Sequence, residues 1–370
     1  MVMIPIIVIF ALSDRILIAI HQDKQVSETA QIYVTLMIPG VWAMGQFDST
    51  KKFLSSQCKN KIPVVVQLLT TVLHFGFCEL FITQMQLRER GAAAATTITY
   101  LLNMILSDIW VRYKKVKKVD KEKRPLVDKN GKETGEMELE FKDMVFWYDV
   151  KCTQELGPFL RIGIPGMLML CFEWWAFELL AIFTGLIGVN DLAAEVVIIN
   201  MISFIFMLPL GISYSASALT GNYLGEGKID LAKRFASLTI LLDVILTTII
   251  VILLYCFADG ISELFTKEKT VIAIIKDTLW VLLIYIWFDT IHGVQSGIIR
   301  GLGRQVYGSI YTLVCYYFIG MPLALVLAFN YKMGIAGLWL GFSIACIILD
   351  TGFALIIGCP DWNQIAKDMR

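Results

Sequence analysis

Long apolar runs separated by short polar segments dominate the chain, and ten of them approach the ~20 residues that a helix needs to cross a bilayer. The runs cover residues 2–20, 31–47, 62–83, 92–112, 158–187, 192–217, 236–258, 271–297, 308–329 and 334–358. The first run is the weakest because Asp14 and Arg15 interrupt it, although adjacent opposite charges can pair and lower the cost of insertion. The pattern predicts an all-α membrane protein, a polytopic bundle of about ten transmembrane helices.

One long polar insert divides these spans into a group of four and a group of six. We therefore expect an N-terminal lobe over residues 1–113, a basic linker over 114–156, a C-terminal lobe over 157–358 and a tail over 359–370. Within the linker, the segment Asp128–Lys132 is typical of a turn and suggests the tip of a small hairpin.

Basic residues follow the even-numbered spans and are sparse after the odd-numbered ones. The dense run that begins at Lys114 follows span four, and Arg300 and Arg304 follow span eight. Basic loops stay on the cytoplasmic side of membranes. With ten spans, this rule places both termini and the linker in the cytoplasm.

Composition supports a membrane protein and excludes several other classes. Hydrophobic residues make up 57% of the 370 residues and charged residues 17%, against about a quarter charged in soluble domains. The formal net charge of +0 gives no reason to expect a nucleic-acid partner. The 8 Cys are scattered without a Cys-x-x-Cys pair, so neither a disulfide framework nor a zinc site is indicated. No hydrolase motif is present, and we expect neither an enzyme nor a cofactor.

Two acids interrupt the fifth span, in the segment Cys171–Leu180. An acid at the membrane centre costs roughly 2.5–3.5 kcal/mol on insertion scales, so such residues usually face a partner or a water-filled cavity. Glu173 and Glu178 lie roughly 140° apart around a helix and should not point at the same spot, and we expect Glu173 to face the cavity. Asp289 in the eighth span is a second candidate, and His292 one turn later is placed to tune its proton affinity.

Other candidates have simpler explanations. The aromatic residues Trp174 and Tyr316 offer faces for a flat cation, but helix packing explains aromatic residues in apolar spans equally well. Four further acids lie nearer span ends, where water lowers the cost, and we expect no functional role for them. They are Glu79, Asp108, Asp243 and Asp350.

The two groups of spans contain an internal repeat. Lys51–Gln57 after span two matches Ile299–Gln305 after span eight, and the segment from His74 to Gly91 has the spacing of Tyr317 to Gly334. Parallel repeats of this kind are a transporter architecture. Because the second group has six spans and the first has four, the N-terminal lobe is expected to lack two helices.

Several motifs together resemble the eukaryotic branch of the multidrug and toxin extrusion (MATE) transporters. They are Phe172–Glu178, Gly221–Gly227, Phe288–Gly301 and Tyr316–Pro322. Taken with the rest of the chain, they resemble spans three to twelve of a twelve-span family. The chain departs from the family at Leu219 and Tyr223, where many relatives carry Arg and Glu.

The resemblance implies an antiporter that exports organic cations and other xenobiotics in exchange for H⁺ or Na⁺. It places the coupling acids at Glu173 and Asp289 and a further cavity residue at Asn200. It also implies small organic cations and the lipid bilayer as partners, a monomer, and a location in the plasma membrane or in a vacuolar or other internal membrane. Two alternatives remain, a flippase for lipids or lipid-linked sugars and an inactive truncated transporter.

Overall fold

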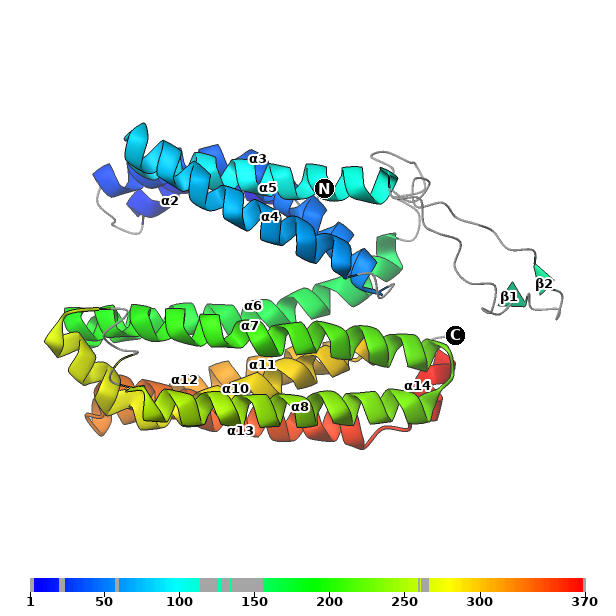
Figure 1. Cartoon of the computed structure of the whole chain (residues 1–370). Helices are drawn as coiled ribbons and strands as arrows, with labels where there is room; N and C mark the ends of the chain where they lie inside the picture. The colour runs from blue at the N-terminus through cyan, green and yellow to red at the C-terminus, as the bar shows by residue number, and fades with distance from the viewer. Residues whose placement is uncertain are drawn as a thin grey trace. The chain divides into compact units, whose positions relative to one another are not determined.

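The computed structural model describes residues 3–19, 24–56, 60–113, 126–127, 133–134, 156–258, 260 and 266–368. The chain divides into two compact units, Met1–Lys151 and Cys152–Arg370, and each is described by itself (Figure 1). The boundary falls inside the expected linker. Most of that linker lies outside the described residues.

The N-terminal unit is built from helices, with one short pair of strands. Its elements are α1 (Met3–Ala11), α2 (Ser13–Ala19), α3 (Lys24–Ser56), α4 (Lys61–Cys78), the π-helix η1 (Glu79–Gln84), α5 (Arg88–Tyr113), β1 (Leu126–Val127) and β2 (Glu133–Thr134). Helix α3 packs closely on α5, since a Cβ at Gly40 would lie 2.9 Å from the Cα of Thr97. The hydroxyl of Thr97 donates to the carbonyl of Leu36 at 2.9 Å and ties the two helices together.

The strands β1 and β2 pair antiparallel, with Leu126 opposite Thr134. This pairing is the one that a hairpin requires. The predicted turn residues 128–132 lie outside the described part of the chain.

The C-terminal unit is a bundle of long helices around α10. Its elements are α6 (Leu156–Ile187), α7 (Val189–Gly225), α8 (Ile229–Cys256), α10 (Lys269–Gly301), α11 (Gln305–Leu313), η4 (Val314–Gly320), α12 (Met321–Leu325), η5 (Val326–Asn330), α13 (Gly334–Gly358) and α14 (Trp362–Asp368). Helix α10 contacts α7, α13, α8 and α11, and α6 packs on α7 and α11 (Figure 1). The central place of α10 explains why most of the C-terminal half of this helix is buried.

Glycines let α10 approach α7 at backbone distance. A Cβ at Gly301 would lie 2.7 Å from the carbonyl oxygen of Ser217, and one at Gly297 would overlap the carbonyl of Ser213. Small residues at helix interfaces permit this close packing in membranes. The Gly-rich end of α10 therefore serves packing, and Gly303 after it adopts a positive φ of 68°.

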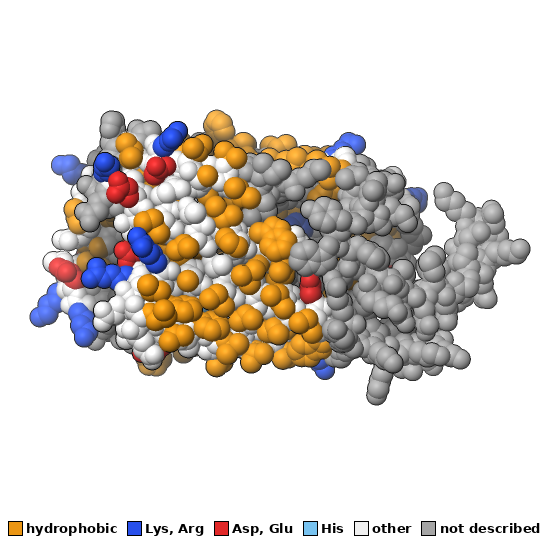
Figure 2. Space-filling model, turned by 90° about the horizontal axis from the view of Figure 1, so that it is seen from above, with side chains coloured by type: hydrophobic (Ala, Val, Ile, Leu, Met, Phe, Trp, Pro, Cys, Tyr) orange, Lys and Arg blue, Asp and Glu red, His pale blue; other side chains and the backbone are white. Residues whose placement is uncertain are grey.

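Eight helices among the described residues are long and apolar enough to cross a membrane, and they correspond to the last eight expected spans. The first two expected spans are not among these eight helices. Residues 3–19 form two short helices, α1 and α2, while polar residues such as Gln31, Gln46 and Asp48 make α3 less apolar. On one face of the molecule, hydrophobic side chains cover the middle and charged side chains gather at one end (Figure 2).

A cluster of charges marks the C-terminal end of α3. The carboxylate of Asp48 lies 2.7 Å from Lys51 Nζ and 3.0 Å from Lys52 Nζ. Burial works to raise the pKa of Asp48, but the two ammonium groups outweigh burial and hold this pKa below its usual value. Lys51 and Lys52, which follow the second expected span, are thus paired with Asp48 at the end of α3.

The internal repeat is present, in a register that differs from the expected one by three residues. The backbone turns after η1 and η5 share their positive φ values, 52° at Gln86 and 57° at Lys332, then 48° at Arg88 and 60° at Gly334. These positions are 246 residues apart, so Gly91 corresponds to Gly337 rather than to Gly334. The expected pairing was wrong because it matched Gly91 to Gly334, whereas Arg88 occupies the position equivalent to Gly334.

Candidate ion-coupling and substrate-binding site

A small pocket in the C-terminal unit brings together residues from α6, α7, α10 and α13. It encloses about 60 Å³. Its lining consists of Glu173, Trp174, Phe177, Glu178, Ile199, Ile202, Ser203, Phe206, Met207, Asp289 and Trp339. Apolar and aromatic walls with three carboxyl groups attract positive charge, but the volume is well below the roughly 300–1,000 Å³ of sites that enclose a small-molecule ligand.

Glu173 lies in this pocket and is buried, with 7% of the residue exposed. Its Oε2 atom is 3.4 Å from Nε2 of His292, which is 119 residues away along the chain. His292 is itself 1% exposed, and its ring packs against Phe353 with centroids 5.0 Å apart. Helix α10 thus presents an imidazole directly to the α6 acid.

Asp289 is the second buried acid of the pocket, at 3% exposure. Its Oδ1 accepts a hydrogen bond of 2.8 Å from the hydroxyl of Tyr285, one turn earlier on α10. Its electrostatic neighbours include Glu173, His292 and Asp243. The predicted proximity of His292 to Asp289 holds, and the direct contact of the imidazole is with Glu173.

The other predicted residues are placed differently. Glu178 and Trp174 are exposed and both border the pocket, so the two acids of α6 touch one pocket despite their angular separation. They do so because the pocket extends along more than one helical turn. Asn200 is exposed, bonds back to the carbonyl of Val196 at 2.8 Å and is not among the lining residues. Tyr316 is fully buried behind the pocket, packed on Phe342.

Three buried acids were not predicted from the sequence, one because it was not considered and two because they were expected to lie near span ends. Glu195 on α7 is 0% exposed and accepts a hydrogen bond of 2.8 Å from Nε1 of Trp339, a residue of the pocket wall. Asp243 on α8 and Asp350 on α13 are 1% and 7% exposed. The expectation that both lie at wet span ends was wrong, because each sits well inside its helix and α10 covers it. Glu195 could have been predicted from its position within the sixth expected span, because an acid inside an apolar span is costly.

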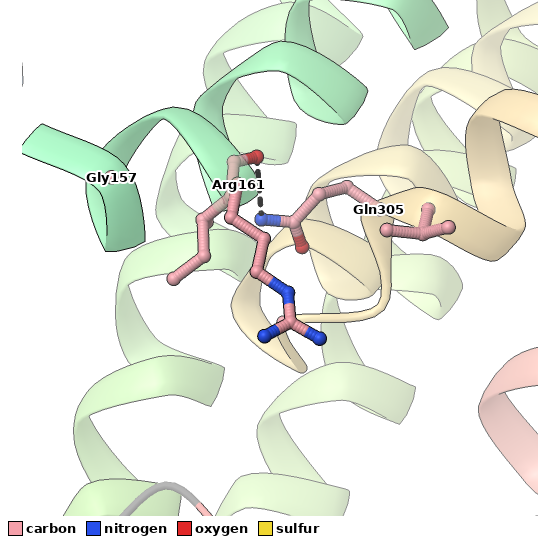
Figure 3. Close-up of a pocket in the computed structure, with 6 residues that line it drawn as sticks. Gly157, Arg161 and Gln305 are labelled. Carbon is pink, nitrogen blue, oxygen red and sulfur yellow. Dashed lines mark hydrogen bonds between the residues drawn. The ribbon is translucent and has the colours of Figure 1, made fainter.

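A larger pocket of about 550 Å³ lies between the beginning of α6 and the turn that joins α10 to α11 (Figure 3). It is lined by Gly157, Arg161, Ile162, Gly303, Gln305 and Val306. The side-chain amide of Gln305 donates to the carbonyl of Ile162 at 3.2 Å and holds the two segments together (Figure 3). Because Arg161 is the charged group of this lining, the pocket repels cations and is a poor candidate for the site.

The fold and the buried acids define a class, the polytopic helical membrane proteins with internal repeats. The MatE family profile matches residues 1–80 and 165–326. Protein DETOXIFICATION 16 of Arabidopsis thaliana is 30% identical over 367 residues, which cover 98% of this chain and 70% of the relative. Multidrug and toxin extrusion protein 1 of Danio rerio is 29% identical over 359 residues, 96% of this chain and 56% of the relative.

The fold agrees with this relationship. The crystal structure of the eukaryotic MATE transporter AtDTX14 superposes with a TM-score of 0.87 at 24% identity, covering 100% of this chain and 78% of that one. This chain belongs to the MatE family and is of the eukaryotic type. It spans less than two thirds of the length of the Danio rerio relative.

Proposed function

We propose that the chain acts as a secondary antiporter that exports organic cations in exchange for protons. The observation that carries the proposal is the pocket in which two buried acids, Glu173 and Asp289, meet aromatic walls. Its relatives include proteins named for multidrug and toxin extrusion, which supports export of xenobiotics.

Competition for the pocket acids provides the coupling. A buried carboxyl group favours its neutral form until an opposite charge arrives. A cation that enters the pocket therefore displaces a proton from Glu173 or Asp289, and a returning proton displaces the cation. A cycle in which cation and proton exclude each other is an antiport cycle.

Protons suit this pocket as the coupling ion because each acid has a titratable neighbour within hydrogen-bonding range. Glu173 faces the imidazole of His292 at 3.4 Å, and Asp289 accepts from the hydroxyl of Tyr285 at 2.8 Å. A histidine beside a carboxyl group exchanges a proton with it near neutral pH, and the hydroxyl of Tyr285 stabilises Asp289 through its hydrogen bond. The exposed aromatic ring of Trp174 at the pocket edge offers a face to a flat cation.

The test is uptake of ethidium, a flat fluorescent cation, into proteoliposomes that contain the full chain. We expect an imposed pH gradient to drive accumulation and a Na⁺ gradient alone to drive none. Glu173→Gln and Asp289→Asn should each abolish the pH-driven accumulation while the protein still inserts. The matched control is Asp277→Asn, an exposed acid on α10, which should transport as the parent does.

Two results would contradict the proposal. Absence of pH-driven uptake by the parent chain would remove the antiport function. Unchanged uptake by Glu173→Gln would remove that acid from the mechanism.

A further inference from the structure

Behind the pocket lies a second set of buried titratable groups that do not line it. They are Asp243 on α8, His292 on α10 and Asp350 on α13, with exposures of 1%, 1% and 7%. Helix α10 packs against both α8 and α13, and its Asp289 lines the pocket. We call these three residues the rear cluster.

The rear cluster is short of hydrogen bonds. Among the described residues, neither oxygen of Asp350 and not the Nδ1 atom of His292 has a hydrogen-bond partner, whereas Asp243 has the hydroxyl of Thr290 close by. An unpaired carboxylate inside a protein costs several kcal/mol, and protonation removes most of that cost. Asp350 therefore needs a proton in this conformation.

His292 connects the rear cluster to the pocket. Its Nε2 atom lies 3.4 Å from Glu173, while the unpartnered Nδ1 atom is the nitrogen left for other partners. Its electrostatic neighbours include Asp350 as well as Glu173. An imidazole that takes up a proton on one nitrogen and releases one from the other is a proton relay.

Other titratable groups face this region from the surrounding elements. Asp350 interacts electrostatically with His292, Asp289 and Asp243. The remaining groups are Tyr285 on α10, Tyr311 on α11, Tyr316 on η4, Cys346 on α13, Glu195 on α7 and Arg300 at the end of α10. Arg300 donates to the hydroxyl of Ser213 at 3.0 Å, which fixes its guanidinium to α7.

We propose that the rear cluster is a second proton-binding site that supplies the coupling proton to the pocket through His292. The proposal rests on the antiport function proposed above. A proton leaves the carboxylic acid of Asp350 and reaches Nδ1 of His292 through water, since no hydrogen bond joins the two groups directly. The imidazolium then releases the proton on Nε2 to the carboxylate of Glu173, and the cation leaves the pocket. Asp350 is afterwards reloaded from water, and the proton left on Nδ1 moves to Nε2 by tautomer exchange, which restores the starting state of His292.

If the relay operates, pH-driven uptake depends on Asp350. Exchange of one cation for another does not depend on Asp350. Exchange of internal for external ethidium requires no net proton movement. In Asp350→Asn and His292→Gln, we expect pH-driven uptake to fall on the order of 100-fold, the usual effect of losing a proton-transfer group. In Asp350→Asn, ethidium exchange should stay within about twofold of the parent, since Asp350 does not line the pocket.

The outcomes separate the proposals. pH-driven uptake by Asp350→Asn at the parent rate would overturn the relay, and so would equal losses of uptake and exchange, because equal losses indicate damage to the bundle. Failure of the parent chain itself to show pH-driven uptake would overturn the antiport function instead.

An infrared spectrum tests the same site without transport. We expect Asp350→Asn to remove intensity from the carboxylic-acid C=O band at neutral pH. Asp277→Asn, an exposed acid on the same helix as His292, should leave this band and both transport rates unchanged. If Asp350→Asn leaves the band intact, Asp350 carries no proton and the proposal fails.

Discussion

The segments α4–η1–α5 and α11–α13 have the same backbone plan and contain different chemistry. In each, a π-helical turn is followed by a loop in which two residues adopt positive φ, at Gln86 and Arg88 in one and Lys332 and Gly334 in the other. In each, the amide of the residue before Arg88 or Gly334 bonds six residues back, from Leu87 to Phe81 and from Met333 to Leu327. The plan therefore does not depend on what the helices bury.

The buried polar groups of the two units differ sharply. Among the described residues of the N-terminal unit, the buried polar side chains are neutral, and the hydroxyl of Thr70 donates to Asn103 at 2.6 Å. In the C-terminal unit the buried set includes Glu173, Asp289 and Asp350. The two segments therefore share a backbone plan although the units that contain them bury different polar groups, neutral ones among the described residues of the N-terminal unit and acids in the C-terminal unit.

The shared plan is most easily broken at the glycine that follows each loop. A Cβ at Gly91 would lie 2.8 Å from the carbonyl oxygen of Phe81, and one at Gly337 would lie 2.7 Å from the amide nitrogen of Ala328. We expect Gly91→Ala and Gly337→Ala each to lower the free energy of unfolding by about 1–3 kcal/mol, because backbone atoms must move. Thermal unfolding in detergent measures both.

Glycines with open space provide the controls for this pair. Gly76 on α4 and Gly358 on α13 have no atom within 4 Å of an added Cβ. Alanine there should be neutral or stabilising by up to about 1 kcal/mol, since alanine favours helix. If Gly91→Ala proves as harmless as its control, the close approach is not a constraint common to the two segments.

Much of the fold was predictable from sequence because insertion into a membrane is governed by local hydropathy. The eight longest apolar helices fell where expected. The first two expected spans are also helical, although α1 and α2 are short and α3 contains polar residues such as Gln31 and Asp48. The repeat was visible, but its register was set by the backbone of the two loops, where Arg88 rather than a glycine occupies the position equivalent to Gly334.

The candidate site could be predicted only where one residue was unusual by itself in the sequence. Glu173 and Asp289 stood out because an acid inside an apolar span is costly. The contact between Glu173 and His292 joins residues 119 apart, so it depends on helix packing. Asp243 was dismissed because span 236–258 placed it near an end, whereas α8 begins at Ile229 and Asp243 lies near its middle.

The neutral pair of the N-terminal unit gives the next prediction. Thr70→Val removes the donor to Asn103 and leaves a buried amide oxygen without that partner, which should cost about 1–3 kcal/mol of unfolding free energy. The pH dependence of ethidium uptake should not change, because no titratable group is lost. Thr71→Val is the control, since Thr71 is exposed and its hydroxyl bonds within α4. A shift of the pH profile in Thr70→Val would show that the N-terminal unit takes part in coupling.

The smallest expected change in unfolding free energy comes from a pair of substitutions at equivalent positions of the two loops, one that introduces a glycine and one that removes a glycine. Arg88 adopts a φ of 48°, where its counterpart Gly334 has a φ of 60° and open space around it. A side chain in this conformation costs roughly 1–2 kcal/mol, part of which glycine loses again through its freedom in the unfolded chain. We therefore expect Arg88→Gly to stabilise by about 0.5–1 kcal/mol and Gly334→Ala to destabilise by a similar amount, as measured by unfolding in detergent. Changes of opposite sign in the unfolding free energy would show that the two loops impose the same backbone conformation. Changes of the same sign would show that the side-chain contacts of Arg88 outweigh the cost of its positive φ.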